Sequence, residues 1–198
     1  MTIHAPLFIV LLPVSAALLC MLFSRIQKNL GSWIVIASIV GAFLSAVTSL
    51  QRVIADGGKP IHYWMGNWQP PLGIEFVIDP ISGALAVLIT FISLLGAIYS
   101  LPFVKEEGWL HIGGYYTLYG LMTVGMCGMV ITGDVFNLYV FLEVMSLSGY
   151  GLIAIGGKKS MLAAFRYLLI GTIGASLYLL GVGYKYSFTG TTNMADMT

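Results

Sequence analysis

Apolar residues occur along this chain in long runs, which are interrupted by short polar or charged segments. A helix needs about 20 mainly apolar residues to cross a bilayer, because each residue advances 1.5 Å through a hydrocarbon layer about 30 Å thick. The pattern predicts six such helices. They are residues 7–23, 33–50, 80–103, 115–132, 135–155 and 161–184.

The fourth and fifth of these helices are predicted as a hairpin. Residues 115–156 are too long for one span and contain only two charged side chains, Asp134 and Glu143. Between the two spans stands the turn signal Thr-Gly-Asp at 132–134, and aspartate is a preferred residue at a helix N-cap. We therefore expect the fifth helix to begin directly after Asp134.

The longest polar stretch, residues 52–79, separates the second and third helices. Its glycine and proline pairs indicate a loop, and Tyr63, Trp64 and Trp68 are typical of aromatic side chains at a membrane interface. Residues 73–79 alternate in polarity and predict a short extended segment.

Composition excludes several classes of protein. Of the 198 residues 58% are hydrophobic and 9% are charged, whereas a soluble domain carries about 25% charged residues to solvate its surface. A net charge of +1 without a basic patch gives no basis for nucleic-acid binding. We expect an all-α integral membrane protein that crosses the cell membrane several times.

The distribution of lysine and arginine predicts the orientation, because loops on the cytoplasmic side carry an excess of these residues. One side collects Arg25, Lys28, Lys105, Lys158, Lys159 and Arg166. The other side collects Arg52, Lys59 and Lys185. Both termini are therefore expected on the outer face.

Three regions are expected along the chain. Residues 1–111 hold the first three helices and the long outer loop 52–79, residues 112–186 hold the last three helices, and residues 187–198 form a polar outer tail.

For most polar side chains the sequence predicts no catalytic or ligand-binding role. His4, His62 and His111 stand alone, and no pair of them has the spacing of metal ligands. The segment 157–160, Gly-Lys-Lys-Ser, lacks the frame of a phosphate-binding loop. The sequence predicts no cofactor, no metal site and no catalytic site of its own.

Glu143 is the exception. It lies near the middle of the fifth helix, where an ionised carboxylate costs at least ~2.5 kcal/mol. Ionisable groups at such depth are usually functional, and we expect this one to bind and release a proton. Tyr139, Ser146 and Tyr150 lie on the same helix face, where they could hold water or tune the acid. The alternative is a neutral glutamate that only hydrogen-bonds a neighbouring helix.

Two further residues leave two interpretations open. Arg166 lies about five residues into the last span, where its long side chain could reach the interface as an anchor or could act on the proton path. Asp134 could be a helix cap or a member of that path.

Residues 132–145, Thr-Gly-Asp-Val-Phe-Asn-Leu-Tyr-Val-Phe-Leu-Glu-Val-Met, closely resemble the fifth-helix signature of antiporter-like subunits. Such subunits occur in Mrp-type multisubunit sodium/proton antiporters, membrane-bound hydrogenases and respiratory complex I. The flanking segments 78–82, 164–169 and 189–196 resemble the same family at its third helix, its sixth helix and the loop that follows.

The resemblance implies a fold equivalent to the first six helices of the family's fourteen. It implies that Glu143 is the membrane-embedded glutamate that works in proton translocation with a lysine on the seventh helix. It also places Arg166 where the family often carries a basic residue.

The resemblance implies a translocase subunit of a prokaryotic cytoplasmic membrane complex. The expected partners are other membrane subunits, including a second chain that supplies the later helices. The expected ions are protons, with sodium as a further candidate. The alternative is a scaffold or assembly subunit that moves no ions.

Overall fold

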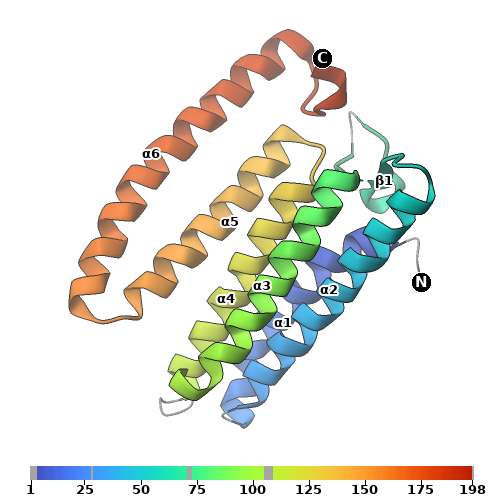
Figure 1. Cartoon of the computed structure of the whole chain (residues 1–198). Helices are drawn as coiled ribbons and strands as arrows, with labels where there is room; N and C mark the ends of the chain where they lie inside the picture. Colours follow the sequence, from blue (N-terminus) through green and yellow to red (C-terminus); the bar gives the residue numbers. More distant parts are fainter. Residues whose placement is uncertain (1–3, 28, 71–72, 105–108, 198) are drawn as a thin grey trace.

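The computed structural model describes residues 4–27, 29–70, 73–104 and 109–197. In this part of the chain six helices are long and apolar enough to cross a membrane, which confirms the predicted number. They are α1 (Ala5–Ile26), α2 (Leu30–Ala55), α3 (Pro80–Val104), α4 (Trp109–Ile131), α5 (Val135–Ala154) and α6 (Lys158–Thr189) (Figure 1).

Helices α1 to α4 form one bundle. Helix α1 packs against α2 and α4, and α3 packs against α2 and α4. Lipid tails are as apolar as leucine, so helices in a membrane associate through close packing of small residues. Accordingly, several alanines are fully buried between these helices, and a Cβ added at Gly120 would lie 3.2 Å from the Ala17 Cβ.

A two-stranded antiparallel hairpin covers one end of the bundle (Figure 1). It pairs β1 (Ile61–Trp64) with β2 (Glu75–Ile78), so that Trp64 lies opposite Glu75. Strand β2 confirms the extended segment expected at 73–79, whereas β1 lies in a stretch predicted only as loop. The described residues nearest to both termini also lie at this end, which is called the hairpin end below.

Helices α5 and α6 lie beside this bundle as a second layer (Figure 1). Helix α5 packs against α4, where Gly125 and Gly128 leave room for the side chains of Met145 and Phe141. Helix α6 packs mainly against α5, and its buried residues are Ala164 and Ala175 within the described ranges. Most of the α6 surface is therefore exposed.

Helix α6 is longer than predicted. It has 32 residues and ends at Thr189, five positions beyond the expected end at residue 184. The charge of Lys185 favours an end of the span at that point, but the helix continues until Gly190, whose φ of 70° provides the left-handed C-cap. At 1.5 Å per residue the helix is about 48 Å long, so it has to tilt or to project beyond a hydrocarbon layer of about 30 Å.

Candidate functional site

The fifth helix begins as predicted, with Asp134 as its N-cap. The Asp134 side chain accepts a hydrogen bond of 2.7 Å from the Asn137 backbone N–H. The Asn137 side chain donates to the Thr132 hydroxyl at 3.0 Å. Asp134 is 5% exposed, so this buried turn sets the direction in which α5 leaves the hairpin end.

Glu143 lies about 12 Å along α5 from its first residue. Phe141 and Ser148 on the same helix are buried, and helical geometry places the Glu143 side chain on nearly the opposite side. Glu143 itself is half-buried. Among the described residues it makes no hydrogen bond or ion pair.

Tyr139 and Tyr150 lie at the interface between α5 and α6, on the side next to Glu143. The Tyr139 ring stacks on Tyr178 of α6 with centroids 6.3 Å apart, and the Tyr178 hydroxyl donates to the Val135 carbonyl at 3.2 Å. The Tyr150 ring contacts Tyr167 at 6.0 Å. Aromatic pairs thus join α5 to α6 on both sides of the Glu143 level.

The other polar member of the predicted stripe, Ser146, is half-buried and makes no hydrogen bond within the described ranges. A cleft of about 330 Å³ opens between the two helices at the level of Tyr150, one turn further along α5. Its lining includes Tyr150, Tyr167, Ile170 and Gly171. None of the stripe residues is hydrogen-bonded to Glu143 itself.

Arg166 is exposed on α6, eight positions after the first residue of that helix. It makes no ion pair with any described residue, Glu143 included. The structure therefore does not bring the two predicted charges together.

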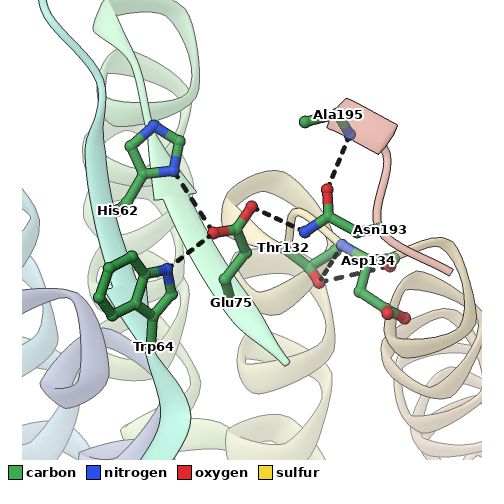
Figure 2. A network of polar contacts seen from close by, with 7 residues as sticks. All are labelled: His62, Trp64, Glu75, Thr132, Asp134, Asn193 and Ala195. Carbon is green, nitrogen blue, oxygen red and sulfur yellow. Dashed lines mark hydrogen bonds and ion pairs between the residues drawn. The ribbon is translucent and has the colours of Figure 1, made fainter. Parts of the chain in front are cut away.

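A buried polar network at the hairpin end was not predicted from the sequence. Glu75 of β2 is 4% exposed, and its carboxylate accepts hydrogen bonds from Trp64 at 3.2 Å and from the Asn193 side chain at 2.9 Å (Figure 2). The His62 ring lies 3.4 Å from the same carboxylate, so the expectation that His62 stands alone is wrong. Strand pairing brings His62 and Glu75 together across 13 sequence positions.

The segment after α6 joins this network. The Val135 N–H donates to the Thr192 carbonyl at 3.0 Å, and the Met194 N–H donates to the Gly133 carbonyl at 2.9 Å. The Thr192 hydroxyl donates to the second carboxylate oxygen of Asp134. The α4–α5 turn is therefore held by the segment that follows α6.

The hairpin holds the same turn from its other side. The Gly133 N–H donates to the Glu75 carbonyl at 3.0 Å. The only sequence signal for this arrangement was an acidic residue between Ile74 and Phe76 in an alternating segment.

A cleft of about 360 Å³ beside the network is lined by residues that include His62, Glu75 and Asp79. Asp79 directly precedes α3, and hydrogen bonds from Ser82, the backbone N–H first, lower the pKa of its carboxyl. No group of three histidine, cysteine, aspartate or glutamate side chains is arranged to hold a metal ion within the residues that the structure describes.

Comparison with known proteins connects this arrangement to one family. The family described as "NADH:quinone oxidoreductase/Mrp antiporter, TM" matches residues 132–198. An NADH-quinone oxidoreductase subunit of Desulforudis audaxviator is 43% identical over 197 residues, and a Na(+)/H(+) antiporter subunit of Bacillus subtilis is 30% identical over 190. These alignments include 100% and 96% of this chain.

Solved structures agree with the sequence comparison. A chain of the membrane-bound sulfane sulfur reductase, an archaeal respiratory membrane complex, superposes with a TM-score of 0.90 at 31% identity over 98% of this chain. A chain of the Mrp complex from Dietzia sp. DQ12-45-1b superposes with a TM-score of 0.81 at 27% identity over 97% of this chain.

The chain spans between 35% and 39% of the length of these four relatives. Its six membrane helices match the corresponding part of the two solved chains. By sequence and by fold, this chain belongs to the family of antiporter-like membrane subunits found in Mrp antiporters and complex I-like respiratory complexes, and the share of each relative that it covers is consistent with an N-terminal portion.

Proposed function

We propose that this chain contributes Glu143 to proton translocation in a multisubunit cation/proton antiporter or an antiporter-linked respiratory complex. The observation that carries the proposal is a single charged side chain among the 20 residues of α5, at the ninth position and so near the middle of the helix. Such a group is costly there and is retained mainly where it binds an ion or a proton. The resemblance of residues 132–145 to the family's fifth helix supports the same role.

Tyr139, Ser146 and Tyr150 are proposed to line the route to Glu143, because they share its side of α5 and border the α6 interface. Arg166 is proposed to act on this route only after another helix has covered it, since it is exposed on α6. Asp134 is proposed to act mainly as the α5 cap, for the contacts described above.

The functional test is replacement of Glu143 in the intact complex. Glu143→Gln keeps the size of the side chain but removes the titratable proton, so proton flux coupled to cation movement should fall at least about ten-fold. Glu143→Asp keeps the carboxylate and should retain part of the flux. Flux is measured in inverted membrane vesicles and is normalised to the amount of assembled complex.

Asp56→Asn is the matched control for this experiment, because Asp56 is an exposed acid at the end of α2. It should leave the flux unchanged. Normal flux in Glu143→Gln would contradict the proposal.

A scaffold subunit that moves no ions is the second candidate. It is favoured by one observation, the lack of any hydrogen bond or ion pair to Glu143 within the described residues. The same experiment separates the two functions, because a scaffold predicts full flux in Glu143→Gln and loss of flux only in variants that fail to assemble.

We further propose that helices of a second chain cover the free side of α5 and bring a basic group to Glu143. Beside Glu143 on α5, Phe136, Val140 and Leu147 are between 39% and 52% exposed. A photo-crosslinking residue at Leu147 should therefore capture a membrane subunit, which mass spectrometry identifies.

The control site for the crosslink is Leu88 of α3, which is similarly exposed at 51% but lies on the α1–α4 bundle. A crosslink at Leu147 to lipid alone, in assembled complex, would contradict the proposed covering helix. Identification of the crosslinked peptide also reports whether it contains a lysine.

The complex is proposed to reside in the prokaryotic cytoplasmic membrane with the hairpin end outside. The excess of lysine and arginine on the opposite loops supports this orientation, although Lys28 and Lys105 lie outside the described residues. Cysteine at Asp56 should react with an impermeant thiol reagent in intact cells, and cysteine at Lys159 should react only in inverted vesicles. The reverse pattern would exclude the orientation.

A further inference from the structure

The loop that follows α6 is fixed by contacts far from it in sequence. Asn193 is 4% exposed, and its side chain donates to Glu75, which lies 118 positions earlier. The Asn193 side-chain oxygen also accepts a hydrogen bond from the Ala195 N–H at 2.8 Å (Figure 2). Asn193 thus uses its amide group to join the hairpin to the loop.

The two oxygens of the Glu75 carboxylate have different partners. One oxygen faces Asn193, and the other faces Trp64 and His62. A buried carboxylate is costly unless its oxygens accept hydrogen bonds. The three donors therefore explain why an acid is tolerated at a position that is 4% exposed.

The Glu75–Asn193 contact matters for α6, because in the described part of the chain that helix packs mainly against one other helix. Its packing is mainly with α5, through the Tyr139–Tyr178 and Tyr150–Tyr167 pairs. At the hairpin end the loop 191–194 adds backbone hydrogen bonds to Gly133 and Val135. Glu75 holds that loop from the side of the first bundle.

We infer that Glu75 and Asn193 form a clamp that positions α6 against α5 and thereby fixes the α5–α6 interface beside Glu143. Glu75 is a positioning residue in this inference, because it touches neither Glu143 nor the aromatic pairs. The effect on ion flux rests on the proposed function of Glu143, but the effect on the position of α6 does not.

The test is an exchange of the two side-chain types. In Glu75→Gln one carboxylate oxygen is replaced by an NH₂ group. This NH₂ group then faces a hydrogen-bond donor, either the Asn193 amide or the Trp64 and His62 rings, so one of the two contacts is lost. Asn193→Asp keeps an oxygen for the Ala195 N–H but sets a carboxylate against Glu75. In the double variant Glu75→Gln with Asn193→Asp, the new amide NH₂ at position 75 can donate to the new carboxylate at position 193. The amide oxygen at position 75 still accepts from Trp64 and His62, and the net charge is unchanged.

The first readout is backbone hydrogen exchange in the assembled complex, at the Val135 and Met194 amides. Each single variant should exchange roughly ten-fold or more faster, as expected when one hydrogen bond to a charged group is lost. The double variant should return to near the wild-type rate. Asp56→Asn serves as the charge-matched control for Glu75→Gln and should not change the rate.

The second readout is the distance between spin labels at Val140 and Leu177, which are exposed neighbours of the stacked Tyr139 and Tyr178. The distance distribution should broaden in the single variants and narrow again in the double variant. Flux per assembled complex should follow the same order.

Unchanged exchange and distances in the single variants would overturn the clamp, as would a double variant no better than the single ones. If a single variant fails to assemble, restored assembly in the double variant supports the clamp and continued failure overturns it. If exchange and distances change in the single variants and return in the double variant, while the flux is the same in all variants, only the link to Glu143 is refuted.

Discussion

Asp134 and Glu143 lie nine positions apart in sequence, at the start and in the middle of α5, yet their surroundings differ completely. Asp134 is buried, caps the helix and accepts a hydrogen bond from Thr192. Glu143 is half-buried and has no such partner within the described residues. The structure therefore supports a cap at the first position, whereas the role of the second position has to be tested by its substitution.

Substitution of Asp134 tests this difference. Asp134→Ala should loosen the first turn of α5 by about 1 kcal/mol, the usual value of an N-cap, with faster hydrogen exchange at Asn137. Asp134→Asn retains an oxygen for the cap and should keep most of the ion flux. Loss of flux in Asp134→Asn with normal exchange would instead place Asp134 on the proton path.

The cap at Asp134 was predictable from the sequence, because a cap depends on residues within one helical turn. The Glu75–Asn193 contact was not, because it joins positions 118 residues apart and depends on how the hairpin folds over the bundle. The pairing of His62 with Glu75 spans only 13 positions and escaped prediction for another reason, because β1 gave no strand signal.

At the scale of elements, the contact between α4 and α5 determines where Glu143 points. A Cβ on Gly125 would lie 2.6 Å from the backbone nitrogen of Met145, so α5 cannot approach α4 as closely if any side chain is present there. This close approach buries Phe141 and leaves the Glu143 side of α5 turned away from the first bundle.

Gly125→Ala should therefore destabilise the chain by about 1–3 kcal/mol, the usual cost of overpacking. The expected result is a lower melting temperature of the purified complex in detergent. Gly149→Ala on α5 is the matched control, because a Cβ there meets no atom within 4 Å. Equal melting temperatures for the two variants would contradict the packing argument.

The number of membrane helices was predictable because it depends only on the length of apolar runs. Helix ends were less predictable: α6 continues past Lys185, because the long lysine side chain can reach the interface while the backbone stays helical. Strand β1 could not be predicted, since four residues gain their conformation from pairing with β2.

At the scale of the whole molecule, the α1–α4 bundle carries α5 and α6 as a second layer (Figure 1). The side of α5 next to Glu143 and most of α6 are apolar and exposed. Relatives are more than twice as long as this chain, and the proposed covering helices would occupy this surface. The family and the six-helix fold could be predicted from the sequence. Identifying the proposed covering helices requires the complete complex, because they are not part of this sequence.

The central claim is that Glu143 gains and loses a proton during turnover. Infrared difference spectroscopy of the assembled complex, started by a pH step, measures this through the C=O stretching band of a protonated carboxyl group. We expect a band that shifts in D₂O and disappears in Glu143→Gln, while Asp56→Asn leaves it unchanged. Identical difference spectra from the wild type and Glu143→Gln would contradict the account.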